Sequence, residues 1–403
     1  MSTARTAPVL LDTTGRRLPA QITELREAGP AARVELPDGL TAWAITRGEV
    51  AKRLLTHPGI SKDARKSWPG YRPGRYPWLT AWVDVVSMFT SDGEDHTRLR
   101  KLVGRAFTPQ RIRDMRPAIE SIVIDLLDDL EDRAPDQAVD LRAAFSHPVP
   151  TRVICDLFGV PDAQRPRMLR VIDSVLDTTA DTERAARIRD ELYTAMTTLI
   201  ETKRTTPGPD LTSTLLTARD DGDRLDETEL LSTLILMIGA GSETAVALIN
   251  HLTHTLLTHP EHLTTLRAHP ERWPDAIEET LRLHPPIHYL PMRYATRDID
   301  LGQGVTIIRG DLVLIGFGAH GLDPQTNPDP HRFDIDRGDR QHLAFGHGIH
   351  YCLGAPLARL EAHIAVPALL ARFPHLRLHN PREIRRQPSF IGNDLQTLPV
   401  LLR

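Results

Sequence analysis

The sequence predicts a mainly α fold with small β-sheets, built as one domain over residues 1–403. Three observations predict it: helical periodicity dominates the chain, strand signals are short and scattered, and the proline clusters are too short to be interdomain tethers. Apolar residues make up 40% and charged residues 25% of the chain, with a formal net charge of -4. These values are typical of a folded globular protein.

The strongest amphipathic patterns predict helices over 112–130, 184–204, 227–257 and 357–373. At the start of the third helix, Asp226 and Glu229 have the spacing of a capping box. This helix is the most apolar one, but Glu243 and Thr244 in its middle would be costly in lipid. We therefore expect a core helix and no membrane span.

Short strands are expected at 34–36, 42–46, 305–308 and 311–315, which suggests small sheets rather than a doubly wound one. Proline-rich loops at 68–78, 207–209, 285–286 and 324–330 punctuate the helices. None marks a domain boundary.

Charge and cysteine content exclude several partners. No block of Lys and Arg suggests a nucleic-acid surface. Residues 1–11 lack the basic start and the small-residue cleavage site of an export signal. The only cysteines are Cys155 and Cys352, which fits a reducing compartment. We expect a cytoplasmic protein without nucleic-acid or membrane partners.

The most informative segment is 345–359, FGHGIHYCLG followed by APLAR. Its glycines allow tight turns and the close approach of a flat ligand, and Pro356 marks the start of a helix. Cys352 therefore lies just before a helix N-terminus, where N–H groups favour the thiolate that metals bind. Two other interpretations stay open from these residues alone: a loop with a buried apolar cysteine, and a zinc site of His347, His350 and Cys352.

This run, with Leu357-Ala358-Arg359 after it, resembles the haem-binding signature of the cytochrome P-450 superfamily. Three further segments match the family in order, so the resemblance extends over essentially the whole chain. It implies the cytochrome P-450 fold, with haem b (iron protoporphyrin IX) buried between two long helices. It also implies that Cys352 is the axial ligand of the iron.

The matching segments imply further roles. Glu279 and Arg282 alone would be a solvated surface pair, but in the family they form a buried structural lock. In the segment 240–245 (AGSETA), taken alone, the threonine would hydrogen-bond to a carbonyl one turn earlier and the glutamate would face a hydrated gap between elements. Neither would indicate a catalytic role. The resemblance instead makes Glu243 and Thr244 the acid–alcohol pair for proton delivery, with Gly241 leaving space beside the helix. Ala245 departs from the family, because many relatives have a second Thr there.

Haem propionates need cationic or hydrogen-bonding partners. His96 and Arg100 lie four apart on one helix face, and Arg293 and His350 match the remaining positions of the family. Alone, each would be ordinary surface charge.

Aromatic residues crowd into one proline-rich segment at Trp68, Tyr71, Tyr76, Trp78 and Trp82. They could pin a long loop by burying their rings, contact the substrate, or do both. The resemblance places substrate contacts in this region, on the long helix and in two later stretches: Trp82, Val83, Val86, Met88, Ala240, Ile287, Tyr289 and Ile391.

The implied function is that of a haem-thiolate monooxygenase, which activates dioxygen to hydroxylate or otherwise oxidise a medium-sized apolar or aromatic molecule of secondary-metabolite, macrolide or steroid type. One alternative is oxidative coupling of aromatic rings, as in a cyclic dipeptide or peptide, without oxygen insertion. Another is a haem-binding or sensing protein without turnover. Electrons are expected from a ferredoxin and a ferredoxin reductase. Leu322 stands where many relatives have an Arg.

Overall fold

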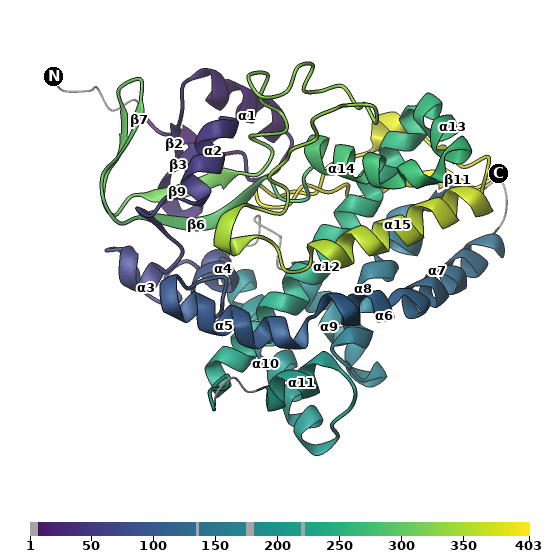
Figure 1. The fold of residues 1–403 in the computed structure, drawn as a ribbon, viewed down its shortest axis with the longest axis horizontal. Coiled ribbons are helices and arrows are strands. Elements are labelled where there is room, and N and C mark those ends of the chain that lie inside the picture. Colours follow the sequence, from purple (N-terminus) through teal and green to yellow (C-terminus); the bar gives the residue numbers. More distant parts are fainter. Residues whose placement is uncertain (1–6, 134–136, 175–180, 219–221) are drawn as a thin grey trace.

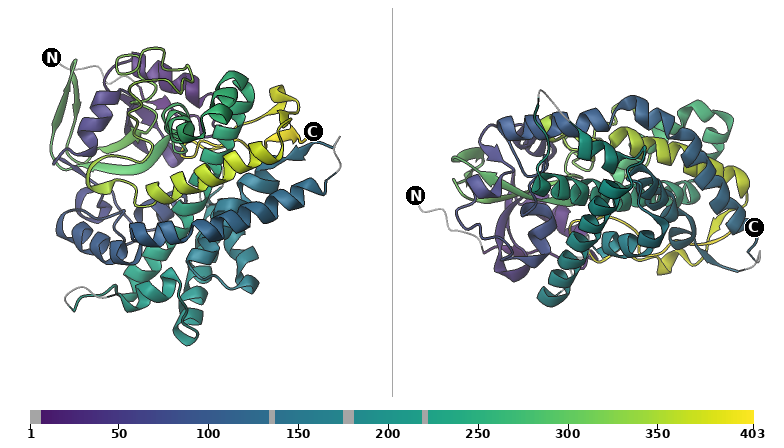
Figure 2. Two further views of the ribbon diagram at one scale, coloured as in Figure 1. Left: turned by 45° about the vertical axis from the view of Figure 1, so that its right-hand side comes forward. Right: turned by 90° about the horizontal axis from the view of Figure 1, so that it is seen from below.

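The structure is a computed structural model that describes residues 7–133, 137–174, 181–218 and 222–403. Helices make up most of it, and the larger β-sheet lies at the end near the N-terminus (Figure 1). The larger sheet and the C-terminus lie on opposite sides of the structure, which the two further views also show (Figure 2). The predicted mainly α class with small sheets is confirmed.

The α-helices of the described residues are named in chain order. They are α1 (Leu18–Glu27), α2 (Gly48–Leu55), α3 (Ala64–Ser67), α4 (Thr80–Val83), α5 (Gly93–Ala106), α6 (Pro109–Asp114), α7 (Arg116–Glu131), α8 (Pro148–Leu157), α9 (Arg165–Ser174), α10 (Thr182–Thr205), α11 (Leu211–Thr217), α12 (Glu227–Thr258), α13 (Pro260–Ala268), α14 (Trp273–Leu283) and α15 (Ala355–Arg372).

The strands form three sheets. The largest has the order β1-β2-β3-β9-β6-β4, the second β10-β11-β5, and the third is the hairpin β7-β8. Their bounds are β1 (Val9–Leu10), β2 (Ala32–Glu35), β3 (Thr41–Ile45), β4 (Ile60–Ser61), β5 (Val139–Asp140), β6 (Tyr289–Ala295), β7 (Ile299–Gly302), β8 (Val305–Ile307), β9 (Leu312–Gly316), β10 (Arg377–Leu378) and β11 (Pro399–Leu401).

The predicted helices are confirmed with small changes at their ends. The pattern over 112–130 is split at Met115 into α6 and α7, and the other three correspond to α10, α12 and α15. The capping box of α12 forms as expected: the Glu229 N–H donates to Asp226 Oδ1 at 2.8 Å, and the Asp226 N–H donates to Glu229 Oε2 at 3.0 Å.

The predicted strands correspond to β2, β3, β8 and β9, but the sequence analysis did not predict β6 as a strand. Strand β6 is the longest of the sheet and pairs with both β9 and β4. Pro291 and a register shift between Leu290 and Arg293 interrupt the alternation that identifies a strand. This strand brings Arg293 into the interior of the protein.

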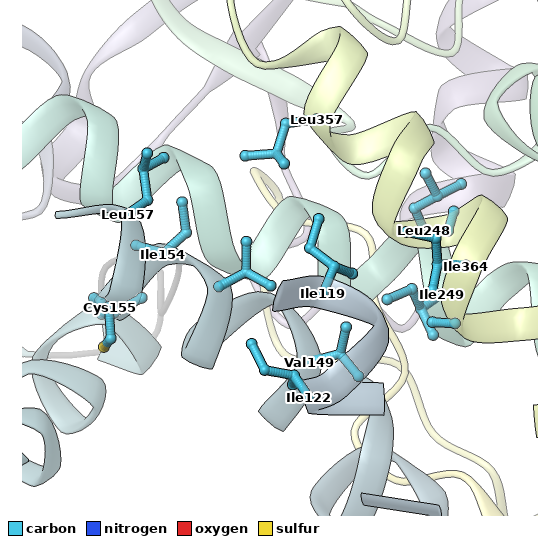
Figure 3. Packing of buried hydrophobic residues seen from close by; sticks show 14 of the residues in the cluster. Ile119, Ile122, Val149, Ile154, Cys155, Leu157, Leu248, Ile249, Leu357 and Ile364 are labelled. Atoms are coloured by element: carbon cyan, nitrogen blue, oxygen red, sulfur yellow. The ribbon is translucent and has the colours of Figure 1, made fainter. Parts of the chain in front are cut away.

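Helix α12 forms the centre of the helical part. It contacts α8, α15, α14 and α10. Side chains of α7, α8, α12 and α15 form one apolar core, which includes Ile119, Ile154, Leu248 and Ile364 (Figure 3). By length and composition α12 could cross a membrane, but 67% of its most apolar window is buried inside the protein. It packs as the core helix that the sequence predicts.

The Glu279 and Arg282 pair is buried, as the resemblance implied. Both side chains are fully buried, and Arg282 donates to the two Glu279 oxygens at 2.7 and 2.9 Å. Arg337, which the sequence analysis missed, donates to the same carboxylate at 3.2 Å. Arg282 also donates to the Pro330 carbonyl at 2.8 Å, so that the ion pair holds the loop leading to Cys352. Leu322 packs as a partly buried apolar side chain beside this loop.

Replacing Glu279 by Gln should lower the free energy of unfolding by about 3–5 kcal/mol, because two guanidinium groups lose their buried carboxylate. Denaturant unfolding of the haem-loaded protein measures this loss. The matched control is Glu24→Gln, which removes an exposed pair with Arg17 at 3.5 Å and should cost less than about 1 kcal/mol. Equal losses in the two variants would contradict a structural lock.

Candidate active site

One mostly apolar cavity, of about 250 Å³, lies between the central helix α12 and the start of α15. Its lining comes from segments far apart in the sequence: the 82–89 region, α5, α8, α12, β6, the loop 344–354 and α15. The cavity therefore contains residues from each of the matched segments; from 279–282 it is Leu281, and not the Glu279 and Arg282 pair, that lines it.

The loop 344–354 holds Cys352 at one wall of the cavity. Gly346 and Gly348 have φ of 75° and 76°, a conformation that favours glycine. A Cβ at Gly348 would also lie 2.7 Å from Thr56 Cγ2. The Cys352 N–H donates to the Phe345 carbonyl at 2.8 Å, which closes the loop. Because α15 begins at Ala355 with a proline in its first turn, Cys352 precedes a helix N-terminus as predicted.

Two opposing influences act on the pKa of the Cys352 thiol. Burial raises the pKa of Cys352, although the backbone N–H groups of Gly354 and Ala355 act in the opposite direction. The helix N-terminus alone therefore does not produce the thiolate, since the loss of hydration outweighs it. Coordination to a metal cation deprotonates a thiol outright, and Cys352 is open to the cavity where such a cation would lie.

Helix α12 supplies a second part of the lining through Ala240, Gly241 and Thr244. The Thr244 hydroxyl donates to the Ala240 carbonyl at 2.8 Å, one turn earlier. The expected open space beside Gly241 is taken by α8, because a Cβ at Gly241 would lie 2.6 Å from Ile154 Cδ1. The glycine thus allows α8 to pack closely against α12 at the cavity.

Glu243 is next to Thr244 in sequence, but it does not line the cavity. Its side chain is 3% exposed, and Arg142, from the π-helical turn η3 (Arg142–Ser146), lies 2.9 Å from Glu243 Oε2. Arg142 also pairs with Asp394 at 2.9 Å. Asn250 donates to the other Asp394 oxygen at 2.9 Å. Glu243 therefore belongs to a buried polar network and does not face a hydrated gap. Arg142 and Asp394, the other charged members of this network, were not predicted from the sequence.

The four residues expected to bind propionates come together. Arg100, Arg293 and His350 line the cavity. The ring of His96 lies 4.5 Å from the ring of His350, and its Nε2 is buried without a hydrogen-bond partner among the described residues. Arg293 is buried in β6 at 6% exposure.

Burial sets the protonation of this group. It lowers the pKa of Arg293 to about 10 and that of His350 to about 4, the latter in spite of a 3.3 Å contact with Asp92. Burial would raise the pKa of Asp92, but hydrogen bonds from His350, Ser61 and the Lys62 N–H keep it well below its usual range. At neutral pH the Arg293 guanidinium is therefore charged and the His350 ring is neutral.

These features fit haem b. The apolar lining suits a flat macrocycle, and the open Cys352 sulfur suits its iron. Arg100 and Arg293 suit its two propionates, because among the described residues no carboxylate oxygen lies within 4.0 Å of either guanidinium. The zinc alternative does not fit, because the described residues contain no group of three or more His, Cys, Asp or Glu side chains that could hold a metal ion.

The predicted substrate contacts divide into two sets. Trp82, Met88, Ala240 and Ile287 line the cavity, whereas Val83, Val86, Tyr289 and Ile391 do not. Val83, Tyr289 and Ile391 instead pack in the apolar core around the larger sheet, since neighbours in a helical turn or strand point in different directions. The sequence analysis missed Phe89, Leu236 and Met237. The last two lie three or four residues before Ala240, so helical periodicity could have found them.

The aromatic segment packs against the larger sheet and also supplies part of the cavity lining. The Trp68 ring stacks against Tyr76 and Tyr294 with ring centres 5.9 Å apart in each pair, and Trp78 meets Phe390 edge-on at 5.6 Å. These rings pin the loop. Of the five aromatic residues, only Trp82 lines the cavity, where it packs edge-on against Phe89 at 6.3 Å.

Glu361 of α15 also lines the cavity and was missed by the sequence analysis. It is 1% exposed, and neither carboxylate oxygen has a hydrogen-bond partner among the described residues. Burial raises its pKa to about 8, so that at neutral pH the carboxyl group is mostly protonated.

Comparison with known proteins shows the family. A family model described as cytochrome P-450 matches residues 274–397. The 2-hydroxy-5-methyl-1-naphthoate 7-hydroxylase of Streptomyces carzinostaticus is 43% identical over 402 residues, which cover 98% of each chain. The 6-deoxyerythronolide B hydroxylase of Saccharopolyspora erythraea is 41% identical over 94% of each chain. The structure of CYP154A1 from Streptomyces coelicolor A3(2) matches with a TM-score of 0.93 and 45% identity, covering 98% of this chain and 100% of that one.

The chain therefore belongs to the cytochrome P-450 family, as the resemblance implied. Its cofactor is haem, and it is a monooxygenase that hydroxylates small molecules, of the bacterial secondary-metabolism group. Like bacterial members of the family in general, it works with redox partners.

Trp82→Ala should lower the preference of the haem-loaded protein for 4-phenylimidazole over imidazole by about tenfold, because an aromatic wall of the cavity is lost. Spectral titration measures both dissociation constants. Trp68→Ala is the matched control from the same segment. It should destabilise the protein, since it breaks the stack with Tyr76 and Tyr294, and leave this preference unchanged. An unchanged preference in Trp82→Ala would contradict a ligand-facing role.

Proposed function

We propose that Cys352 would bind the haem iron and that the cavity would hold both the haem and the substrate. The observation that carries this proposal is the convergence of an open cysteine sulfur, the α12 hydroxyl of Thr244 and the buried Arg293 guanidinium on one apolar cavity. A haem iron with a thiolate ligand supplies the dioxygen-activating chemistry. His96, Arg100, Arg293 and His350 hold the propionates.

In this proposal Thr244 and Glu243 deliver protons. The Thr244 oxygen lies at the cavity, and its hydrogen bond to Ala240 fixes the side chain while leaving lone pairs to accept a proton. Glu243, the residue before Thr244, is held by its ion pair with Arg142. It does not line the cavity and so does not contact the substrate directly. The carboxyl group of Glu243 and the hydroxyl group of Thr244, on consecutive residues, provide a path for protons from the buried network to the cavity.

The lining supports a substrate class. Apart from the cationic group, the lining is dominated by Trp82, Met88, Phe89, Met237 and Ile287, which suit a medium-sized apolar or aromatic molecule. The relatives that act on a naphthoate and on 6-deoxyerythronolide B support a secondary metabolite of aromatic or macrolide type. Binding of candidate compounds can be screened through the spin state of the iron.

Oxidative coupling without oxygen insertion stays a second candidate. A relative described as an enzyme for C–S bond formation in chuangxinmycin biosynthesis is 34% identical, with a TM-score of 0.88 over 100% of this chain. That relative forms a bond between substrate atoms. The product mass separates the candidates, because hydroxylation adds one oxygen atom and coupling removes two hydrogens.

The electron donors in this proposal are a ferredoxin and its reductase, and the protein acts in the cytoplasm as one domain over 1–403. The described residues form the cytochrome P-450 fold and include no flavin or iron–sulfur module. Ile349 and Tyr351, 56% and 40% exposed, lie next to Cys352 and near Arg100, where a partner can dock.

Thr244→Ala should uncouple reductant use from product formation by about tenfold or more, because the hydroxyl proton donor is lost at the cavity. The ratio of product formed to reductant oxidised measures the coupling. Thr255→Ala, on the same helix and away from the cavity, is the control and should keep the wild-type ratio. Unchanged coupling in Thr244→Ala would exclude Thr244 from proton delivery.

A further inference from the structure

Lys62 is a buried lysine that neither the motifs nor the family resemblance singled out. It follows β4 and is 3% exposed. Its ammonium lies 3.6 Å from the centre of the Phe89 ring and 3.4 Å from the Pro291 carbonyl oxygen. Within the described parts of the chain, no carboxylate oxygen comes within 4.0 Å of it.

A buried ammonium without a counterion is costly, because an aromatic face and a single long carbonyl contact replace only part of its hydration. The surroundings of Lys62 further disfavour its charged form. Burial, together with the positive charge of Arg293, lowers the pKa of Lys62 well below its usual range. Asp92 is the nearby carboxylate, but it binds the Lys62 backbone N–H at 2.7 Å, the Ser61 hydroxyl at 2.5 Å and His350 at 3.3 Å.

The side chain of Lys62 lines the same cavity as Arg100, Arg293 and His350. The basic side chains here are Lys62, Arg100 and Arg293. The carboxylate beside them, Asp92, already binds His350, Ser61 and the Lys62 backbone N–H. The basic side chains of this group therefore outnumber its carboxylates by two. The two propionates of haem b are two carboxylates on one ligand, which balances the group.

We propose that Lys62 binds a haem propionate beside Arg293, as a further cofactor-binding residue. The inference rests on the proposed placement of the haem in this cavity. A carboxylate on the substrate is the competing ligand. The charge balance favours the haem, since without Lys62 two propionates and Asp92 would face only two fixed cations.

The test compares Lys62→Met and Lys62→Arg with Lys66→Met, an exposed lysine four residues later whose ammonium pairs with Asp95 at 2.7 Å. The rate of haem transfer from the holoenzyme to excess apomyoglobin should rise about ten- to a hundredfold in Lys62→Met, the effect expected for a hydrogen bond between charged groups. Lys62→Arg should keep most of the retention, and Lys66→Met should match the wild type.

A second measurement reports charge rather than packing. The reduction potential of the haem should fall in Lys62→Met, because a nearby positive charge favours the reduced iron, and should be restored in Lys62→Arg. A merely structural role would not produce this pattern. Unchanged haem transfer and unchanged potential in Lys62→Met would overturn the assignment.

Titration with 1-naphthoate separates the two carboxylate sources. Its affinity should be similar in wild type and Lys62→Met. A loss of 1-naphthoate binding with normal haem transfer would overturn the assignment and make Lys62 a substrate-binding residue. Wild-type protein that lacks a thiolate-type spectrum with carbon monoxide would instead overturn the proposed function, and the role of Lys62 with it.

Discussion

The position of one sulfur atom is the constraint on which the site depends. Cys352 reaches the cavity because two glycines with positive φ turn the loop, its N–H closes that loop onto Phe345, and α15 begins three residues later. The buried pair of Glu279 and Arg282 holds the preceding loop in place. The parts of the fold that surround Cys352 are therefore rigid, as a metal ligand requires.

Charge is arranged around the cavity in two separate groups. One group, with Arg293, Lys62 and Asp92, carries excess positive charge and suits an anionic cofactor edge. The other group joins Glu243, Arg142 and Asp394 in a buried network behind α12. Thr244 lines the cavity, whereas the residues of this second group do not.

Sequence reasoning could predict what depends on local pattern. The long helices, the capping box at Asp226 and the start of α15 follow from periodicity and caps, and family motifs gathered Arg100, Arg293 and Cys352 correctly at one cavity. It could not predict β6, whose alternation is broken at Pro291. The sequence also does not show that Trp82 lines the cavity whereas Val83 does not, because tertiary packing decides which side chain faces a cavity. For the same reason Lys62 and Arg142 were not found.

The protonation of Cys352 shows the same limit, because burial outweighs the helix N-terminus that the sequence reveals. The most direct test of the account is therefore the carbon monoxide difference spectrum of the reduced protein, wild type against Cys352→Ala. We expect a thiolate-type haem spectrum in the wild type and its complete loss in the variant. The same thiolate-type spectrum in Cys352→Ala, or wild-type protein that binds no haem, would contradict it.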